Sequence, residues 1–181
     1  IMNCIIYLVR SSEKDVEEFN KSLRLLEENL LKYTTADVLV FVEESFEKYK
    51  PKVETNLELL YQTIEFNLPD YPSEIIDNIP EFYPHPTHGN GPIEWGHPGF
   101  TMGYRHMCRL FSGEIYKFPV VQKYEYYIRL DTDSFIHTSL GYDIFKWAKD
   151  NECWYGYVAP AVQQDNEKVV EGLSEFVNSI Y

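Results

Sequence analysis

Basic residues and long apolar runs are scarce in this 181-residue sequence, and their scarcity excludes several classes of protein. There are 16 Lys and Arg against 29 Asp and Glu, so the formal net charge is −13. A field of this sign repels polyanions, which argues against a nucleic-acid partner. No apolar run is long enough to cross a membrane, and no basic stretch precedes an apolar one near the first residue. We therefore expect a soluble, cytoplasmic chain.

Cysteine is also scarce. The three cysteines, Cys4, Cys108 and Cys153, are an odd number without metal-site spacing. Cys4 lies in an apolar run and Cys108 on the apolar side of a predicted helix, so we interpret them as buried reduced thiols, which favours a reducing compartment. The histidines at 85, 88 and 97 make a poor zinc motif because no thiol or acidic partner lies near them.

Apolar and aromatic residues are abundant, at 44% and 16% of the sequence. This composition predicts one globular domain over residues 1–181. Prolines and glycines interrupt residues 66–100 throughout, which denies this stretch regular structure. Its aromatic residues indicate a long ordered loop packed on the body of the domain.

The first third of the chain has the pattern of a strand, a helix and a second strand. Residues 4–9 and 38–42 are continuous apolar runs, as in buried parallel strands. Between them, Ser12 is a suitable helix N-cap, and apolar residues recur at helical spacing as far as Leu30. Arg10 follows the first strand, and Glu43 and Glu44 follow the second. A nucleotide would bind there in a Rossmann-like domain, but these residues are equally well interpreted as ordinary solvated turn residues.

The later elements are predicted from the same periodicities. In chain order they are a partly helical stretch at 46–66, a helix at 101–111, a strand at 124–131, a helix at 142–149, a strand at 154–158 and a helix at 167–179. Together they indicate an α/β fold with a Rossmann-like, mainly parallel sheet flanked by helices.

Two carboxylates, Asp131 and Asp133, follow the strand at 124–131 and are separated by one residue. In an open α/β sheet, ligands bind just beyond the carboxyl ends of the strands. A hard oxygen site with few protein ligands suits Mg²⁺ or Mn²⁺, with phosphate oxygens and water completing the coordination. The sequence therefore predicts a metal–diphosphate site at these two residues.

Two arginines, Arg105 and Arg109, are four residues apart on the predicted helix at 101–111. Two guanidinium groups on one helix face can neutralise phosphates or orient carboxylates. They can also be structural ion-pair partners in an acidic protein, and both interpretations stay open.

Two enzyme classes share an acidic pair after an apolar strand. A haloacid-dehalogenase-like phosphatase would use Asp131 as its nucleophile. Its motif requires Thr or Val where this chain has Phe135, and it normally follows the first strand. A nucleotide-sugar glycosyltransferase holds a metal with the pair, and its motif comes late, as here. The order of elements favours the transferase. A non-catalytic module that binds a sugar nucleotide or a glycan is the third alternative.

A family resemblance supports the transferase. The run from Tyr104 to Arg109 (Tyr-Arg-His-Met-Cys-Arg), the Ser112-Gly113 pair and the stretch from Tyr124 to Arg129 resemble the core of glycosyltransferase family 15, the fungal α-1,2-mannosyltransferases. The resemblance spans nearly the whole chain. It implies a GT-A fold, retaining transfer of a sugar to a glycan hydroxyl, Mn²⁺ (or Mg²⁺) as the metal, and GDP-mannose as the first candidate donor, with a UDP-sugar as the second.

The resemblance also implies roles for individual residues. It places Asp131 and Asp133 at the metal and diphosphate, Tyr104 near the donor sugar, Arg10 at the nucleotide side, and Arg105 and Arg129 as supporting donor-binding residues. Tyr104 and Asp131 are the candidate catalytic residues.

This chain departs from the family in two places. The family usually has Glu-Pro-Asp where this chain has Asp-Thr-Asp, which leaves the donor open. The family also continues with a candidate catalytic Glu and a metal-binding His, and nothing up to Tyr181 matches either. Three alternatives follow: the chain is a minimal transferase that uses other residues, it needs a downstream domain, or it binds the donor without efficient transfer. We expect a Golgi lumen location if the chain is part of an anchored enzyme.

Overall fold

The computed structural model describes residues 2–67, 82–83 and 100–156. The chain divides into two compact units. The first consists of Ile1–Asn67 and Phe111–Tyr155, and the second of Leu68–Leu110 and Gly156–Tyr181. The single domain expected over residues 1–181 stays a prediction.

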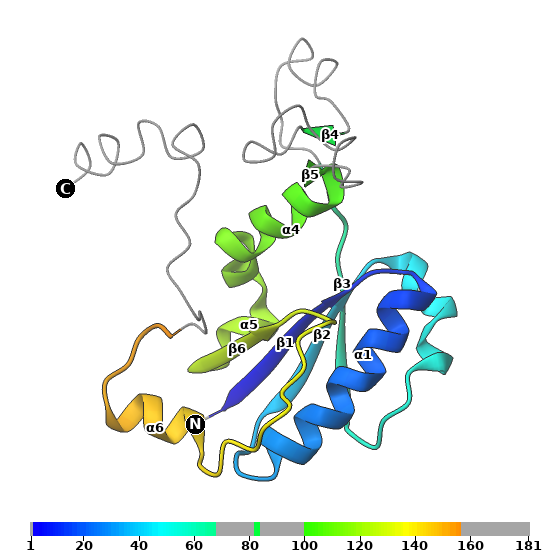
Figure 1. The fold of residues 1–181 in the computed structure, drawn as a ribbon. Helices are drawn as coiled ribbons and strands as arrows, with labels where there is room; N and C mark the ends of the chain where they lie inside the picture. Colours follow the sequence, from blue (N-terminus) through cyan, green and yellow to red (C-terminus); the bar gives the residue numbers. More distant parts are fainter. Residues whose placement is uncertain (1, 68–81, 84–99, 157–181) are drawn as a thin grey trace, which may run out of the picture. The chain divides into compact units, whose positions relative to one another are not determined.

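The first unit is built on a four-stranded parallel sheet (Figure 1). Its order is β3-β2-β1-β6. The strands are β1 (Asn3–Val9), β2 (Asp37–Val42), β3 (Leu59–Thr63) and β6 (Tyr126–Leu130). Tyr7 is paired with Leu130 and Val9 with Val42, so the carboxyl ends of β6, β1 and β2 lie side by side. The α/β fold with a parallel sheet is thus confirmed.

One face of the sheet is covered by α1 (Glu13–Leu26), which continues as the π-helical turn η1 (Glu27–Leu31). Ser12 caps α1, as predicted, because its side chain accepts a hydrogen bond from the backbone N–H of Asp15 (3.1 Å). The apolar stripe of α1 is buried against alternate residues of the strands. This core includes Ile5, Tyr7, Val9, Val38, Val40 and Val42 from the sheet and Val16, Phe19, Leu23 and Leu26 from α1.

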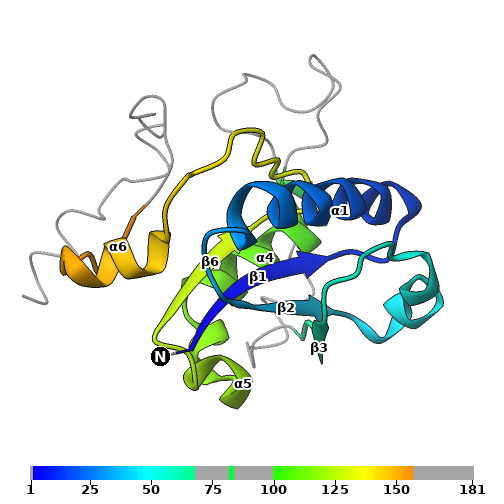
Figure 2. The ribbon, with the colours of Figure 1, turned by 90° about the horizontal axis from the view of Figure 1, so that it is seen from below.

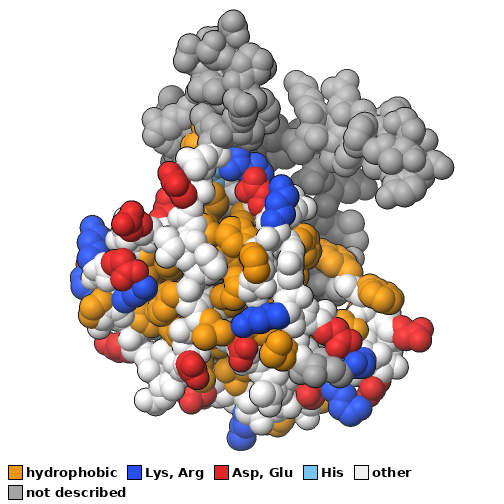
Figure 3. Space-filling view, turned by 180° about the vertical axis from the view of Figure 1, so that it is seen from behind, with side chains coloured by type: hydrophobic (Ala, Val, Ile, Leu, Met, Phe, Trp, Pro, Cys, Tyr) orange, Lys and Arg blue, Asp and Glu red, His pale blue; other side chains and the backbone are white. Residues whose placement is uncertain are grey.

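The opposite face of the sheet carries η4 (Glu114–Lys117) and α5 (Pro119–Gln122). Figure 2 shows α1 on one side of the sheet and α5 on the other. Phe41 of β2 packs edge-on against Phe118, with ring centroids 5.1 Å apart. Seen from the side opposite α1, hydrophobic side chains gather in the middle of the described surface and charged ones lie around them (Figure 3).

The helical prediction for residues 46–66 is wrong over its second half. In the first half, two short 3₁₀ turns form, η2 (Glu44–Lys48) and η3 (Lys50–Lys52). In the second half, residues 59–63 are strand β3. Leu59 and Tyr61 lie on one face of β3 and pack on the core beside β2. Pairing with the edge of β2 has outweighed a helical spacing that the sequence also permits.

The helix predicted at 142–149 is confirmed as α6 (Ile144–Asp150), which Asp143 caps by accepting hydrogen bonds from two backbone N–H groups. Burial would raise the pKa of Asp143, but hydrogen bonds from Thr34 and from the Lys146 and Phe145 backbone lower it below its ordinary value. Residues 154–156 have no regular structure, so the predicted strand is wrong over its described part.

The described part of the second unit contains a short antiparallel pair, β4 (Phe82–Tyr83) with β5 (Phe100–Thr101). The helix predicted at 101–111 is confirmed as α4 (Met102–Ser112), whose last two residues belong to the first unit. The rest of the loop at 66–100, its histidines included, and the helix at 167–179 lie outside the described residues. Among the helices that are described, none combines the length and apolarity that a membrane span requires.

Candidate functional site at the carboxyl edge of the sheet

A tight turn follows β6 and carries the two predicted carboxylates. The backbone N–H of Ser134 donates to the carbonyl of Asp131 (2.9 Å), and the Asp131 N–H donates to Ser134 Oγ (3.0 Å). Asp131 and Asp133 are exposed, whereas Thr132 between them is buried. The turn therefore presents both carboxylates to solvent at the end of a central strand, where the sequence predicted a site.

Arg129 holds the first of these carboxylates. Its Nη2 and Nε lie 2.8 and 3.2 Å from Asp131 Oδ1, and its guanidinium lies 4.0 Å from the centre of the Phe111 ring. The Asp131 side chain is 54% exposed, so this ion pair adds little to stability. Its effect is to orient Asp131 while leaving Oδ2 without a hydrogen-bond partner among the described residues.

Asp133 is the less constrained of the two acids. Within the described part of the chain it accepts no hydrogen bond and forms no ion pair. No group of three His, Cys, Asp or Glu side chains that could hold a metal occurs among the described residues. A cation at this turn would therefore need further oxygen ligands from a bound molecule and from water, which Mg²⁺ and Mn²⁺ accept readily.

The turn after β1 is ordered around the carboxylate of Asp15. Asp15, whose side chain is 6% exposed, accepts a hydrogen bond from Arg10 Nε (2.9 Å) and one from the Ser12 hydroxyl. The Arg10 side chain is 76% exposed. Arg10 thus extends from the carboxyl end of β1 with its Nε held by Asp15. The Ser-x-x-Asp spacing at the helix start was the signal in the sequence that could have revealed the role of Asp15.

The turn after β2 lies beside the turn after β1. Ser11 Oγ and Ser45 Oγ are 2.6 Å apart and join the two turns. Glu43 and Glu44 are exposed at the end of β2, as predicted. Arg10, Glu43 and Asp131 therefore follow three of the four parallel strands directly, at one edge of the sheet.

The remaining predicted site residues lie on α4 in the second unit. Tyr104 is 48% exposed and Arg105 is partly buried. Their roles, and those of the other predicted site residues, stay predictions. Cys108 is exposed rather than buried, which corrects the expectation drawn from the apolar stripe of this helix, while Cys4 is buried as expected.

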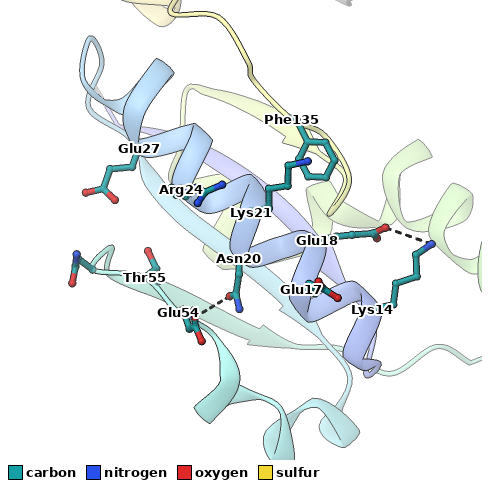
Figure 4. Close-up of a pocket in the computed structure, with 11 residues that line it drawn as sticks. Lys14, Glu17, Glu18, Asn20, Lys21, Arg24, Glu27, Glu54, Thr55 and Phe135 are labelled. Atoms are coloured by element: carbon teal, nitrogen blue, oxygen red, sulfur yellow. Dashed lines mark hydrogen bonds and ion pairs between the residues drawn. The ribbon is translucent and has the colours of Figure 1, made fainter.

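A separate hollow follows the outward side of α1 (Figure 4). Its charged residues are of both signs and are partly paired: Lys14 Nζ lies 3.4 Å from Glu18 Oε1, and Lys21 Nζ lies 4.0 Å from the centre of the Phe135 ring. Mixed charge without a dominant sign gives this hollow no preference for a diphosphate. It differs in this respect from the acidic turn after β6.

The sequence of the chain matches one family over almost all of its length. Residues 2–178 match the family described as glycolipid 2-alpha-mannosyltransferase. Alpha-1,2 mannosyltransferase KTR1 of Saccharomyces cerevisiae is 32% identical over 89 residues, which are 44% of this chain and 23% of that protein. O-glycoside alpha-1,2-mannosyltransferase omh1 of Schizosaccharomyces pombe is 30% identical over 156 residues, which are 83% of this chain and 38% of that protein.

Solved structures share the fold. The mannosyltransferase Ktr4p from S. cerevisiae superposes with a TM-score of 0.70 at 24% identity, over 98% of this chain and 44% of that one. The same enzyme in complex with GDP gives a TM-score of 0.68 at 23% identity, over 98% of this chain and 45% of that one. Core-mannan synthase A from Aspergillus fumigatus, in its Mn/GDP form, gives 0.66 at 19% identity, over 99% of this chain and 47% of that one.

The chain thus spans less than half the length of these relatives. The structural likeness confirms the predicted fold class, and the family match confirms the resemblance seen in the core motifs. Because the match extends over residues 2–178, this chain belongs to the glycolipid 2-alpha-mannosyltransferase family of glycosyltransferases.

Proposed function

We propose that this chain binds the donor in a metal-dependent transfer of mannose from GDP-mannose to a glycan hydroxyl. The observation that carries the proposal is the turn after β6, which presents Asp131 and Asp133 beside the carboxyl end of β1. Family membership supports the reaction class. Two solved relatives, one in complex with GDP and one in an Mn/GDP form, support the nucleotide and the metal.

The two carboxylates fit a hard divalent cation, Mn²⁺ or Mg²⁺. Asp133 is proposed as a direct ligand, since no described residue competes for it, and Asp131 as the second acid, held in place by Arg129. When bound, the cation would offset the charge of the nucleotide diphosphate as the glycosidic bond breaks. It would also compensate for the acidic field of the chain, which would otherwise repel the donor.

The other residues bind or orient the donor in this proposal. Arg10, fixed at Nε by Asp15, reaches toward the nucleotide from the end of β1. Tyr104 and Arg105 are proposed beside the donor sugar and its phosphates on the family resemblance of the α4 sequence. Attack by an acceptor hydroxyl on the face that the diphosphate leaves would retain the anomeric configuration.

The proposal is tested by calorimetric titration of GDP into the chain with and without Mn²⁺. We expect binding that depends on Mn²⁺. In Asp133→Asn the affinity should fall by at least about a hundredfold, the upper value for residues that only orient metal ligands. The matched control is Glu58→Gln, which neutralises an exposed carboxylate just before β3, at the amino edge of the sheet, and should leave affinity unchanged. Unchanged affinity in Asp133→Asn would contradict the metal role.

Catalysis is separated from mere binding by product release. A transferase should release GDP from GDP-mannose when a mannoside acceptor is added, and slowly to water without it. A non-catalytic binding module would release none over several hours. Membership of a glycosyltransferase family argues against the phosphatase alternative, which would instead hydrolyse an aryl phosphate with Mg²⁺.

A further inference from the structure

The segment after the acidic turn has no helix or strand between residues 134 and 143, yet it is fixed in place. It is held by side chains and backbone of the first helical region and by Thr34, which follows that region. The bonds are Ser22 Oγ to the Ser134 carbonyl (2.7 Å), Asn29 Nδ2 to the Ile136 carbonyl (2.7 Å), Leu140 N–H to the Asn29 carbonyl (3.2 Å) and Thr34 Oγ1 to Asp143 Oδ1 (2.7 Å). The helix that covers the sheet therefore also positions the segment that contains the turn's last residue.

The bond nearest the acidic turn is part of a longer chain of hydrogen bonds. Ser22 Oγ lies 2.8 Å from the hydroxyl of Tyr7, and both residues are buried. A carbonyl oxygen can only accept, so Ser22 gives its single proton to Ser134. Tyr7 must then donate to Ser22. The hydrogen bonds therefore run in one direction, from the Tyr7 O–H to the Ser22 O–H to the Ser134 carbonyl.

This chain of donors keeps its direction at any ordinary pH. Burial raises the pKa of Tyr7 to about 12, so the hydroxyl stays protonated. Each bond in such a buried chain polarises the next. Ser22 is a small polar residue in the buried stripe of α1, between the apolar residues Phe19 and Leu26. The serine is thus explained by the carbonyl that it binds.

We infer that Tyr7 and Ser22 are positioning residues for the acidic turn and, resting on the proposed function, for its metal. Ser134 closes the turn through its N–H and Oγ, and its carbonyl is held by Ser22. Asp133 precedes Ser134 directly and has no described partner of its own. Its backbone position therefore depends on Ser134. Fixing Ser134 restricts where the Asp133 carboxylate can reach before any ligand arrives, which reduces the ordering that binding must impose.

The test uses two readouts on folded protein, well below its melting temperature. The first is amide hydrogen exchange at residues 131–134 without ligand, which reports the turn whether or not a metal binds. In Ser22→Ala we expect protection at Ser134 to fall about tenfold, the size of one lost hydrogen bond. The second is the Kd for Mn²⁺ in the presence of GDP, measured from free Mn²⁺ by electron paramagnetic resonance. We expect it to rise about tenfold.

Two controls separate positioning from general stability. Asn29→Ala removes the donor to Ile136, two residues beyond Ser134, and should lower Tm without changing exchange at 131–134 or the Mn²⁺ affinity. Tyr7→Phe keeps Ser22 but removes its donor, and should shift both readouts in the direction of Ser22→Ala by a smaller factor. If the Ser22 variant does not fold, Tyr7→Phe alone decides the question.

The outcomes are distinct. Equal exchange at 131–134 in wild type, Ser22→Ala and Tyr7→Phe would overturn the positioning role whatever the metal does. Increased exchange with an unchanged Mn²⁺ affinity would overturn its connection to the metal. A wild-type chain that binds neither Mn²⁺ nor GDP would instead overturn the proposed function, and the exchange data would still decide whether Ser22 holds the turn.

Discussion

The two edges of the parallel sheet differ in whether their acidic side chains have hydrogen-bond or ion-pair partners. At the amino edge two of the acids have partners: Tyr124 donates to Asp37 Oδ2 (2.6 Å), and Lys149 Nζ lies 3.2 Å from Glu125 Oε1. At the carboxyl edge Asp133 has none among the described residues, and Asp131 shares only Oδ1 with Arg129. The amino edge is arranged for stability, while the carboxyl edge leaves acidic oxygens available to a cation.

The largest expected contrast is between Asp131→Asn and Asp37→Asn, which remove the same charge at opposite edges. Asp131→Asn should weaken Mn²⁺-dependent GDP binding by about tenfold to a hundredfold and leave Tm nearly unchanged. Asp37→Asn should do the reverse, with about 1 kcal/mol lost in the free energy of unfolding. Calorimetry and urea denaturation measure the two effects. A loss of ligand affinity in Asp37→Asn would remove the distinction between the edges.

The next effect appears at alkaline pH. The pKa of Tyr7 is raised from its ordinary value near 10 to about 12, so the unfolded chain loses this proton first as pH rises. The stabilisation is therefore complete below pH 10 and is lost as pH rises toward 12, by roughly 2 kcal/mol over this window. Urea denaturation at pH 9, 10 and 11 should show a steeper decline for wild type than for Tyr7→Phe. Parallel curves would contradict the assignment.

Arg129→Lys tests whether orientation of Asp131 matters beyond its charge. A lysine keeps the positive charge but cannot reach Oδ1 with two nitrogens or stack flat on Phe111. We expect the Kd for GDP with Mn²⁺ to rise about fivefold, which corresponds to one lost hydrogen bond of about 1 kcal/mol. An unchanged Kd would show that charge alone is sufficient.

Tyr124→Phe measures how much the uncharged hydrogen-bond donor to Asp37 contributes to stability at the amino edge. Burial, and then the Asp37 carboxylate that accepts its hydrogen bond, raise the pKa of Tyr124. Removing the hydroxyl should cost about 1 kcal/mol of unfolding free energy at pH 7 without affecting ligand affinity. Chemical denaturation of Tyr124→Phe and of Tyr7→Phe compares the two losses of unfolding free energy. A change in GDP affinity in Tyr124→Phe would contradict its purely structural role.

The smallest effect is expected from the Lys149–Glu125 ion pair. Both side chains are nearly half exposed, so a double-mutant cycle with Lys149→Ala and Glu125→Ala should give a coupling energy below about 1 kcal/mol, reduced by salt. A larger coupling would mean that the pair is better shielded than its exposure indicates.

The sequence predicted the fold where burial patterns are local. Continuous apolar runs gave β1 and β2, the N-cap and apolar stripe gave α1, and periodicity gave β6. It failed for β3, because apolar residues around Leu59 fit both a helix and an edge strand. Only pairing with β2 selects between these, and that choice is not encoded in local spacing.

For the site, the sequence by itself determined the acidic pair and its place at the end of a strand, since both follow from local order along the chain. The tertiary structure alone decided how the turn that carries the pair is held. Arg129 and Asp131, like Arg10 and Asp15, are near neighbours in the sequence, whereas Ser22 binds a carbonyl 112 residues away. The physical reason is that a hydrogen bond forms within about 3 Å, and only the packing of α1 on the sheet brings such distant residues that close.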